Sequence, residues 1–166
     1  MSEPPPSAAR VVVLDEQRAV EVDADRWAAL AAAVLRDEGV SPDLELTVSF
    51  VEADVIAGLK AEHLAGDGSP TDVLAFPIDA EPEVAGPGLL GDVIVCPEVA
   101  AAQAGGRDGL RRAHDGSVDA ELSLLVVHGI LHLLGHDHVD DAEAAVMIGR
   151  EEHHLDRWVR SGEVTT

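Results

Sequence analysis

The sequence predicts an α+β domain in which a small four-stranded mixed sheet packs with about five helices. Three observations predict this class: two early strands are separated by a helix, the next two strands are adjacent along the chain, and the remainder is mostly helical. A length of 166 residues is enough for one domain with a real core and short for two. We therefore expect a disordered leader over residues 1–10 and a single domain over residues 11–166.

The composition is typical of a globular protein without an export signal. The chain is 46% hydrophobic but only 2% aromatic, so its core must consist mainly of Ala, Val, Leu and Ile. The opening MSEPPPSAAR lacks the regions of a signal peptide. The longest apolar run, of about 14 residues, is below the roughly 18 to 20 that a membrane span needs. The single Cys96 excludes an intrachain disulfide and fits a reducing cytoplasm, where we expect the protein.

The first part of the chain alternates strands and helices, which we expect at residues 11–14, 23–39, 44–51 and 53–65. Residues 11–14, VVVL, are rich in β-branched side chains, and LELTVSFV at 44–51 alternates as a half-buried strand does. The helix at 23–39 has Asp23 or Asp25 as its cap, apolar residues at helical spacing, and Gly39 as its stop.

The second part begins with two strands and continues with helices, expected at residues 71–78, 89–96, from 97, at 118–134 and at 141–159. Residues 79–88 are rich in Pro, Gly and acid and predict a loop between the two strands. Pro97 suits the first turn of a helix. Gly135 stands where a left-handed cap would end the helix at 118–134.

Four histidines occur within HGILHLLGHDH, residues 128–138. His128 and His132 are four residues apart on the predicted helix, so their side chains share a face, which Gly129 leaves uncrowded. If Gly135 ends the helix and lets the chain double back, His138 completes a set of three imidazoles around one ion. Such a set with a water in the fourth position is typical of catalytic zinc sites.

Other roles for these residues must be weighed. Histidines can be solvated or bonded to backbone carbonyls in a core, but three at this spacing with a glycine break favour a metal. His136 is expected to support the site indirectly or to be exposed. Asp137 either orients a ligand imidazole or only forms a turn. The spacing also matches metzincin peptidases, whose general-base glutamate is replaced here by Gly129, so a peptidase is disfavoured.

Several segments resemble the YbeY family, bacterial metal-dependent endoribonucleases of ribosomal RNA maturation. HGILHLLGHDH resembles the family signature HGxLHLxGxDH, SPTDVLAFPID resembles its PTDVLSFP block, and LLGDVIVCPEVAAAQA resembles a third block. ELSLLVVHGILHL and the terminal helix containing Met147 follow in the expected order. Together these segments cover residues from about 55 to 155, nearly two thirds of the chain.

The resemblance implies a zincin-like fold with one zinc ion per chain, held by His128, His132 and His138. It implies single-strand-specific endoribonuclease activity in late maturation of the small-subunit rRNA 3′ end and in ribosome quality control. The expected partners are ribosomal RNA and the ribosome, with no membrane and no DNA. Many members carry an asparagine and an arginine before the TDVL block, where this chain has Lys60 and Leu64 and an apparent extra loop residue. RNA contact through that arginine is therefore in question.

The net charge of −21, from 32 acidic and 11 basic residues, argues against nucleic-acid binding unless a salt-rich cytoplasm screens it. The densest basic cluster, just before the histidine helix, would either meet phosphates or form an ordinary solvated loop; it comprises Arg107, Arg111, Arg112 and His114. Other arginines are expected to pair with acids on the last helix, namely Arg150, Arg157 and Arg160. Three histidines are expected at the surface, namely His63, His153 and His154.

The expected nucleophile is water activated by zinc, whose pKa falls to about 7 in such sites. Asp72 and Asp92 at strand ends are candidate bases, but no protein base is assigned. A second hypothesis is a zinc-stabilised ribosome-binding module with little turnover, which Cys96 or Asp137 as a fourth ligand would favour. A third hypothesis is a zinc hydrolase for a small substrate, favoured by a narrow pocket without a basic groove.

Overall fold

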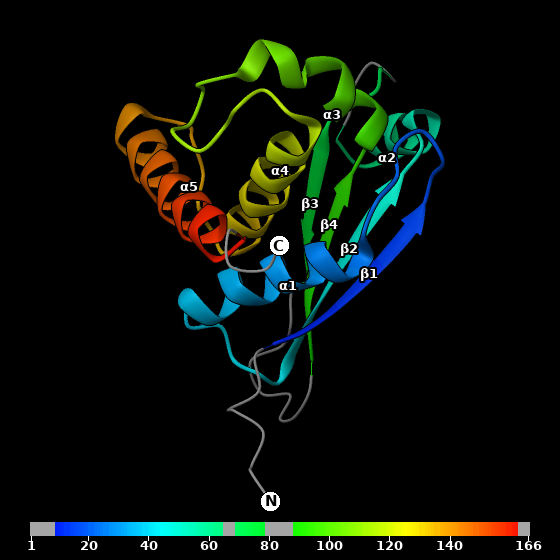
Figure 1. The fold of residues 1–166 in the computed structure, drawn as a ribbon. Coiled ribbons are helices and arrows are strands. Elements are labelled where there is room, and N and C mark those ends of the chain that lie inside the picture. Colours follow the sequence, from blue (N-terminus) through cyan, green and yellow to red (C-terminus); the bar gives the residue numbers. More distant parts are fainter. Residues whose placement is uncertain (1–8, 65–68, 79–87, 163–166) are drawn as a thin grey trace, which may run out of the picture.

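A four-stranded mixed sheet forms the centre of the fold (Figure 1). In this computed structural model, which describes residues 9–64, 69–78 and 88–162, the strands are β1 (Arg10–Glu16), β2 (Leu44–Val51), β3 (Val73–Pro77) and β4 (Gly88–Val95). Their order is β1-β2-β4-β3. The first three of these run parallel, and β3 pairs antiparallel with β4. The predicted α+β class with a mixed sheet is confirmed.

The helices lie close to their predicted positions, and they are α1 (Ala24–Asp37), α2 (Ala53–Leu64), α3 (Pro97–Gln103), the short 3₁₀ helix η1 (Ala104–Arg107), α4 (Val118–Leu133) and α5 (Asp141–Gly162). Asp23 is the N-cap of α1, and its carboxylate accepts a hydrogen bond from the Arg26 N–H. Residues 1–8 of the expected leader and 79–87 of the expected loop lie outside the described residues. Ala9 is already buried in the core.

The two faces of the sheet are covered by different helices (Figure 1). Val93 and Val95 of β4 join the main core with α1 and α4, whereas the alternate residue Ile94 packs in a second cluster with Ile56 of α2. Helix α5 packs on the outer side of α4. None of the helices in the described part of the chain is long and apolar enough to span a membrane.

Helix α4 ends as the sequence predicts. Gly135 has a φ of +98°, in the left-handed region that favours glycine. The Gly135 N–H donates to the His132 carbonyl at 3.1 Å, and the His136 N–H donates to the Leu131 carbonyl at 3.0 Å. These two bonds form a Schellman motif, which satisfies the last carbonyls of the helix and reverses the chain.

The structure explains the glycine at position 129 by a contact other than the predicted one. A Cβ atom at this position would lie 2.6 Å from Cγ1 of Val93 and 3.3 Å from Cγ2 of Val73. The glycine therefore faces the sheet and permits close contact between α4 and the strands β3 and β4. The expectation that it keeps the histidine face uncrowded is wrong.

We expect Gly129→Ala to lower the free energy of unfolding, because the added Cβ would lie 2.6 Å from Cγ1 of Val93, which is fully buried. Overpacking of this kind costs about 1 to 3 kcal/mol, reduced by up to about 1 kcal/mol through the higher helix propensity of alanine. Urea unfolding followed by circular dichroism measures the change. Gly149→Ala in α5 is the control, since its Cβ meets nothing within 4 Å and should be neutral or stabilising. Equal stability of the two variants would contradict this account.

Candidate metal centre

The three predicted histidines lie together at the C-terminal end of α4. The ring centroids of His128 and His132 are 4.7 Å apart, and those of His132 and His138 are 5.3 Å apart. The third pair, His128 and His138, is 5.9 Å apart. Two rings come from one helix face, and the third returns after the turn at Gly135, as the spacing predicts.

The donor atoms identify a subset that is already close enough to share an ion. One ligand atom each from His132, Asp137 and His138 lies within 4.8 Å of the other two. His128 stands beside this set, with its ring against both other imidazoles. Imidazole nitrogens with a carboxylate oxygen suit zinc and similar divalent metals, so the residues present fit such an ion.

His132 is half-buried, and its surroundings favour the neutral form of its ring. Burial lowers its pKa below the ordinary 6.5, and the neighbouring His128 and His138 rings lower it further. The ring is therefore neutral at pH 7 and has a lone pair for a cation. The His138 side chain, in contrast, is 59% exposed and places the centre at the surface.

Asp137 contacts the next residue along the chain. Its Oδ1 accepts a hydrogen bond from the His138 backbone N–H at 2.8 Å and lies 3.4 Å from Nδ1 of the His138 ring. The two readings of Asp137, as a turn former and as a partner of a ligand imidazole, are therefore compatible. His136 is half-buried and lines a cavity of about 270 Å³ with Gly135 and Asp137.

Glu151 of α5 is part of this centre, and sequence reasoning missed it. Its Oε2 lies 2.6 Å from Nδ1 of His128, and its side chain is 1% exposed. Burial alone would raise the pKa of Glu151, but hydrogen bonds from His128 and Arg111 outweigh burial and hold it below the ordinary 4.5. The carboxylate is therefore ionised at neutral pH. The two partners are 23 positions apart in the sequence, so no local pattern of residues indicates their contact.

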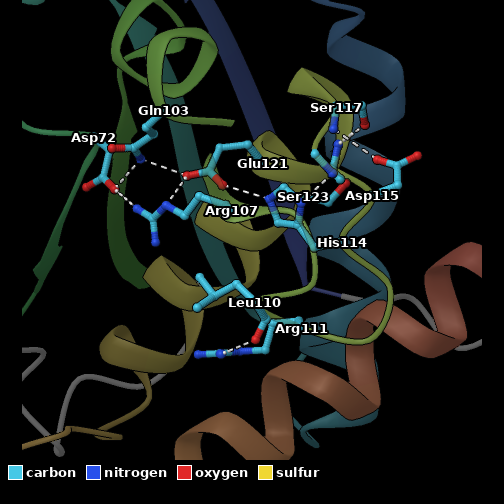
Figure 2. A network of polar contacts seen from close by, with 12 residues as sticks. Asp72, Gln103, Arg107, Leu110, Arg111, His114, Asp115, Ser117, Glu121 and Ser123 are labelled. Carbon is cyan, nitrogen blue, oxygen red and sulfur yellow. Dashed lines mark hydrogen bonds and ion pairs between the residues drawn. The ribbon is translucent and has the colours of Figure 1, made fainter. Parts of the chain in front are cut away.

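Arg107 of the predicted basic cluster is paired with carboxylates (Figure 2). It contacts Asp72 at 3.1 Å and Glu121 at 3.2 Å. Gln103 spans the same two residues, donating to Asp72 at 2.8 Å and to Glu121 at 2.7 Å. Glu121 is completely buried, so this network neutralises and holds a charge inside the fold.

The other two arginines of the cluster bind helix α5. Arg111 contacts Glu151 at 2.7 Å, and Arg112 contacts Asp156 at 2.6 Å and Glu152 at 3.6 Å. These pairs attach the segment before α4 to α5. Neither the phosphate-binding reading nor the solvated-loop reading of the cluster anticipates this arrangement.

His114 is buried, and its ring is held by hydrogen bonds within the protein. The Gly116 N–H donates to its Nδ1 at 3.0 Å, so the ring proton is on Nε2, which donates to Glu121 at 2.8 Å (Figure 2). Both ring nitrogens are thus occupied. At 3% exposure, His114 is not available to a phosphate.

Neither candidate base stands at the centre. Asp72 is bonded to Gln103 and Arg107. Asp92 precedes Val93 in β4 and therefore points away from α4, and burial raises its pKa above the ordinary 3.8.

A second group with metal-binding residue types joins α1 to α5. One ligand atom each from Asp37, His153 and His154 lies within 4.8 Å of the others. However, Arg150 and Arg157 also contact the Asp37 carboxylate, at 3.3 and 3.1 Å. Because guanidinium groups already supply positive charge to the Asp37 carboxylate, we interpret this group as an ion-pair network.

The expectation that His154 lies at the surface is wrong, since it is 4% exposed. The expectation that Arg150 and Arg157 pair with acids of the last helix is wrong, since among the described residues their ion pairs are with Asp37 and Glu38 at the end of α1.

Lys60 and Leu64, where the chain departs from the pattern of the family it resembles, both belong to α2. Lys60 lies in α2 and its Nζ donates to Ser69 Oγ at 3.3 Å. Helix α2 ends at Leu64, whose side chain lies outside the described residues, as do residues 65–68.

Cys96 lies across the sheet from the histidines. It is fully buried in the second cluster with Val51, Ile56 and Leu74. It therefore does not contribute to the centre at the end of α4, and the hypothesis that Cys96 closes the metal shell is not supported by its position.

Three comparisons relate this chain to known proteins. The family model described as Endoribonuclease YbeY matches residues 12–159. Two proteins named Endoribonuclease YbeY are similar: one from Salinispora tropica, 40% identical over 89% of this chain and 95% of its own, and one from Beutenbergia cavernae, 44% identical over 77% and 83%. The solution structure of TM1509 from Thermotoga maritima has a TM-score of 0.61 at 24% identity, covering 93% of each chain, and supports the fold.

Burial raises the pKa of the Cys96 thiol above the ordinary 9.0. We therefore expect it to react with a disulfide reagent at least about tenfold more slowly in the folded protein than in urea, because only the thiolate attacks. The absorbance of the released thiol measures both rates. Added zinc should leave the folded-state rate unchanged, and protection by zinc would contradict the position of Cys96.

Proposed function

Because this chain belongs to the YbeY family of endoribonucleases, we propose that it is a zinc-dependent enzyme that cleaves single-stranded RNA at a centre formed by His128, His132 and His138. We further propose that its substrate is ribosomal RNA, that it acts in 3′-end maturation of the small-subunit RNA and in ribosome quality control, and that it works in the cytoplasm. The observation that carries the metal assignment is the convergence of three imidazole rings, with centroids 4.7 to 5.9 Å apart.

The three histidines would reach a bound ion from two sides. His128 and His132 present their nitrogens from one rigid helix, and His138 approaches from the exposed side. A bound zinc ion would supply a Lewis acid for the phosphodiester and make hydroxide accessible near neutral pH. Asp137 and His138 have side chains that are 48% and 59% exposed, so the centre is open to a polymer. An open surface centre suits RNA better than the third hypothesis, a narrow pocket for a small substrate.

The first test concerns the metal. We expect wild-type protein to bind one zinc ion per chain, and His132→Ala to lose zinc affinity by more than about 100-fold, since removing a ligand costs more than removing its outer partner. Metal content after dialysis and cleavage of an rRNA-derived oligonucleotide should fall together. His136→Ala, in the same turn, is the matched control and should retain both. Cleavage by metal-free His132→Ala would refute the proposed mechanism.

The second test concerns charge. With a net charge of −21 and the arginines of the predicted cluster paired internally, we expect long-range repulsion of RNA. Raising KCl from about 50 to 500 mM shortens the Debye length, so kcat/KM for a short RNA should rise several-fold. Most nucleic-acid binding shows the opposite trend. Zinc content measured at each salt concentration is the control.

A steep fall of kcat/KM with salt would instead indicate a local cationic surface. Zinc binding without any cleavage across the salt series would favour the second hypothesis, a ribosome-binding module with little turnover.

A further inference from the structure

We propose that Glu151 is a positioning residue for the metal centre: its carboxylate selects the Nδ1–H tautomer of His128 and directs Nε2 of that ring toward the ion. Arg111 in turn fixes the carboxylate. This inference rests on the proposed function, because it assumes that His128 is a ligand. It adds two residues outside the histidine segment to the machinery of the centre.

The geometry of the hydrogen bond determines the tautomer. Nδ1 of His128 lies 2.6 Å from Oε2 of Glu151. An ionised carboxylate only accepts hydrogen bonds, so the ring nitrogen that faces it must carry the proton. In a neutral ring, Nε2 then keeps its lone pair. That nitrogen is the one left for a cation.

The carboxylate itself has little freedom. Arg111 donates to Oε1 of Glu151 from Nε at 2.8 Å and contacts the same oxygen from a terminal nitrogen at 2.7 Å. His128 uses the other oxygen, so each carboxylate oxygen has its own partner. The Glu151 and Arg111 side chains are 1% and 15% exposed, which limits competition from water.

Three segments therefore converge on one ring: α4 through His128, α5 through Glu151, and the chain before α4 through Arg111. Arg112 strengthens this arrangement because it attaches the same segment to Asp156 of α5 at 2.6 Å. Outer carboxylates that orient a ligand imidazole typically contribute about 10- to 100-fold to metal affinity. Among the described residues, Glu152 forms its hydrogen bond and ion pair with Arg112 and none with His128, so it is a control one residue away on the same helix.

The test measures zinc affinity of the full-length protein by competition with a chromophoric chelator. We expect Glu151→Ala to bind zinc about 10- to 100-fold more weakly than wild type. The zinc affinity of Glu151→Gln should lie between those of wild type and Glu151→Ala, because the glutamine amide oxygen can still accept a hydrogen bond from Nδ1 but carries no charge. Glu152→Gln should match wild type. Circular dichroism tests whether each variant is folded. If Glu151→Ala does not fold, the comparison of Glu151→Gln with wild type is the test.

A second readout needs no metal. Nitrogen-15 NMR of the metal-free protein at pH 8 should show His128 with a protonated Nδ1 in wild type and in Glu152→Gln, and a mixture of tautomers in Glu151→Ala. Unchanged zinc affinity in folded Glu151→Ala and Glu151→Gln, or an unprotonated Nδ1 in wild type, would overturn the positioning role alone. Failure of wild-type protein to bind zinc would overturn the proposed function and this inference together.

Discussion

The candidate centre depends on how closely α4 approaches the sheet. At Gly129 the helix backbone occupies the space next to Val93 and Val73 that a side chain would otherwise fill. This contact fixes both the rotation of α4 and its distance from the strands. Residues one before and three after the contact point lie on the flank of the helix. His128 and His132 are therefore directed beside the sheet, where the chain returning from the turn can meet them.

Internal pairing takes up much of the positive charge of this acidic chain. Two of its carboxylates, Glu121 and Glu151, are almost completely buried beside α4. An unpaired buried charge is strongly destabilising, so each needs a cation. Arg107 supplies it to the first and Arg111 to the second. The chain has 11 basic residues against 32 acidic ones. Because part of this positive charge is paired with buried carboxylates, the overall field at the surface repels RNA. Attraction of RNA must then be local, because the net charge of the chain does not supply it.

The same two carboxylates show how a structural histidine differs from a candidate ligand. His114 donates from Nε2 to Glu121 and accepts at Nδ1 from the Gly116 N–H, so neither nitrogen remains for another partner. His128 donates from Nδ1 to Glu151 and lies against two other imidazoles. Both histidines pair with a buried glutamate, but the hydrogen bond of His128 uses Nδ1 alone, and its ring lies against the other two imidazoles.

The sequence by itself determined the strands and helices, the shared helical face of His128 and His132, and the reversal at Gly135. Each of these depends on residues within about one turn of one another, where helical spacing and backbone sterics operate directly. Only the tertiary structure decided that Gly129 faces the sheet and that Glu151 orients the His128 ring. Those features depend on contacts between segments far apart in the chain. Their geometry is set by packing and strand register, which no local pattern of residues encodes.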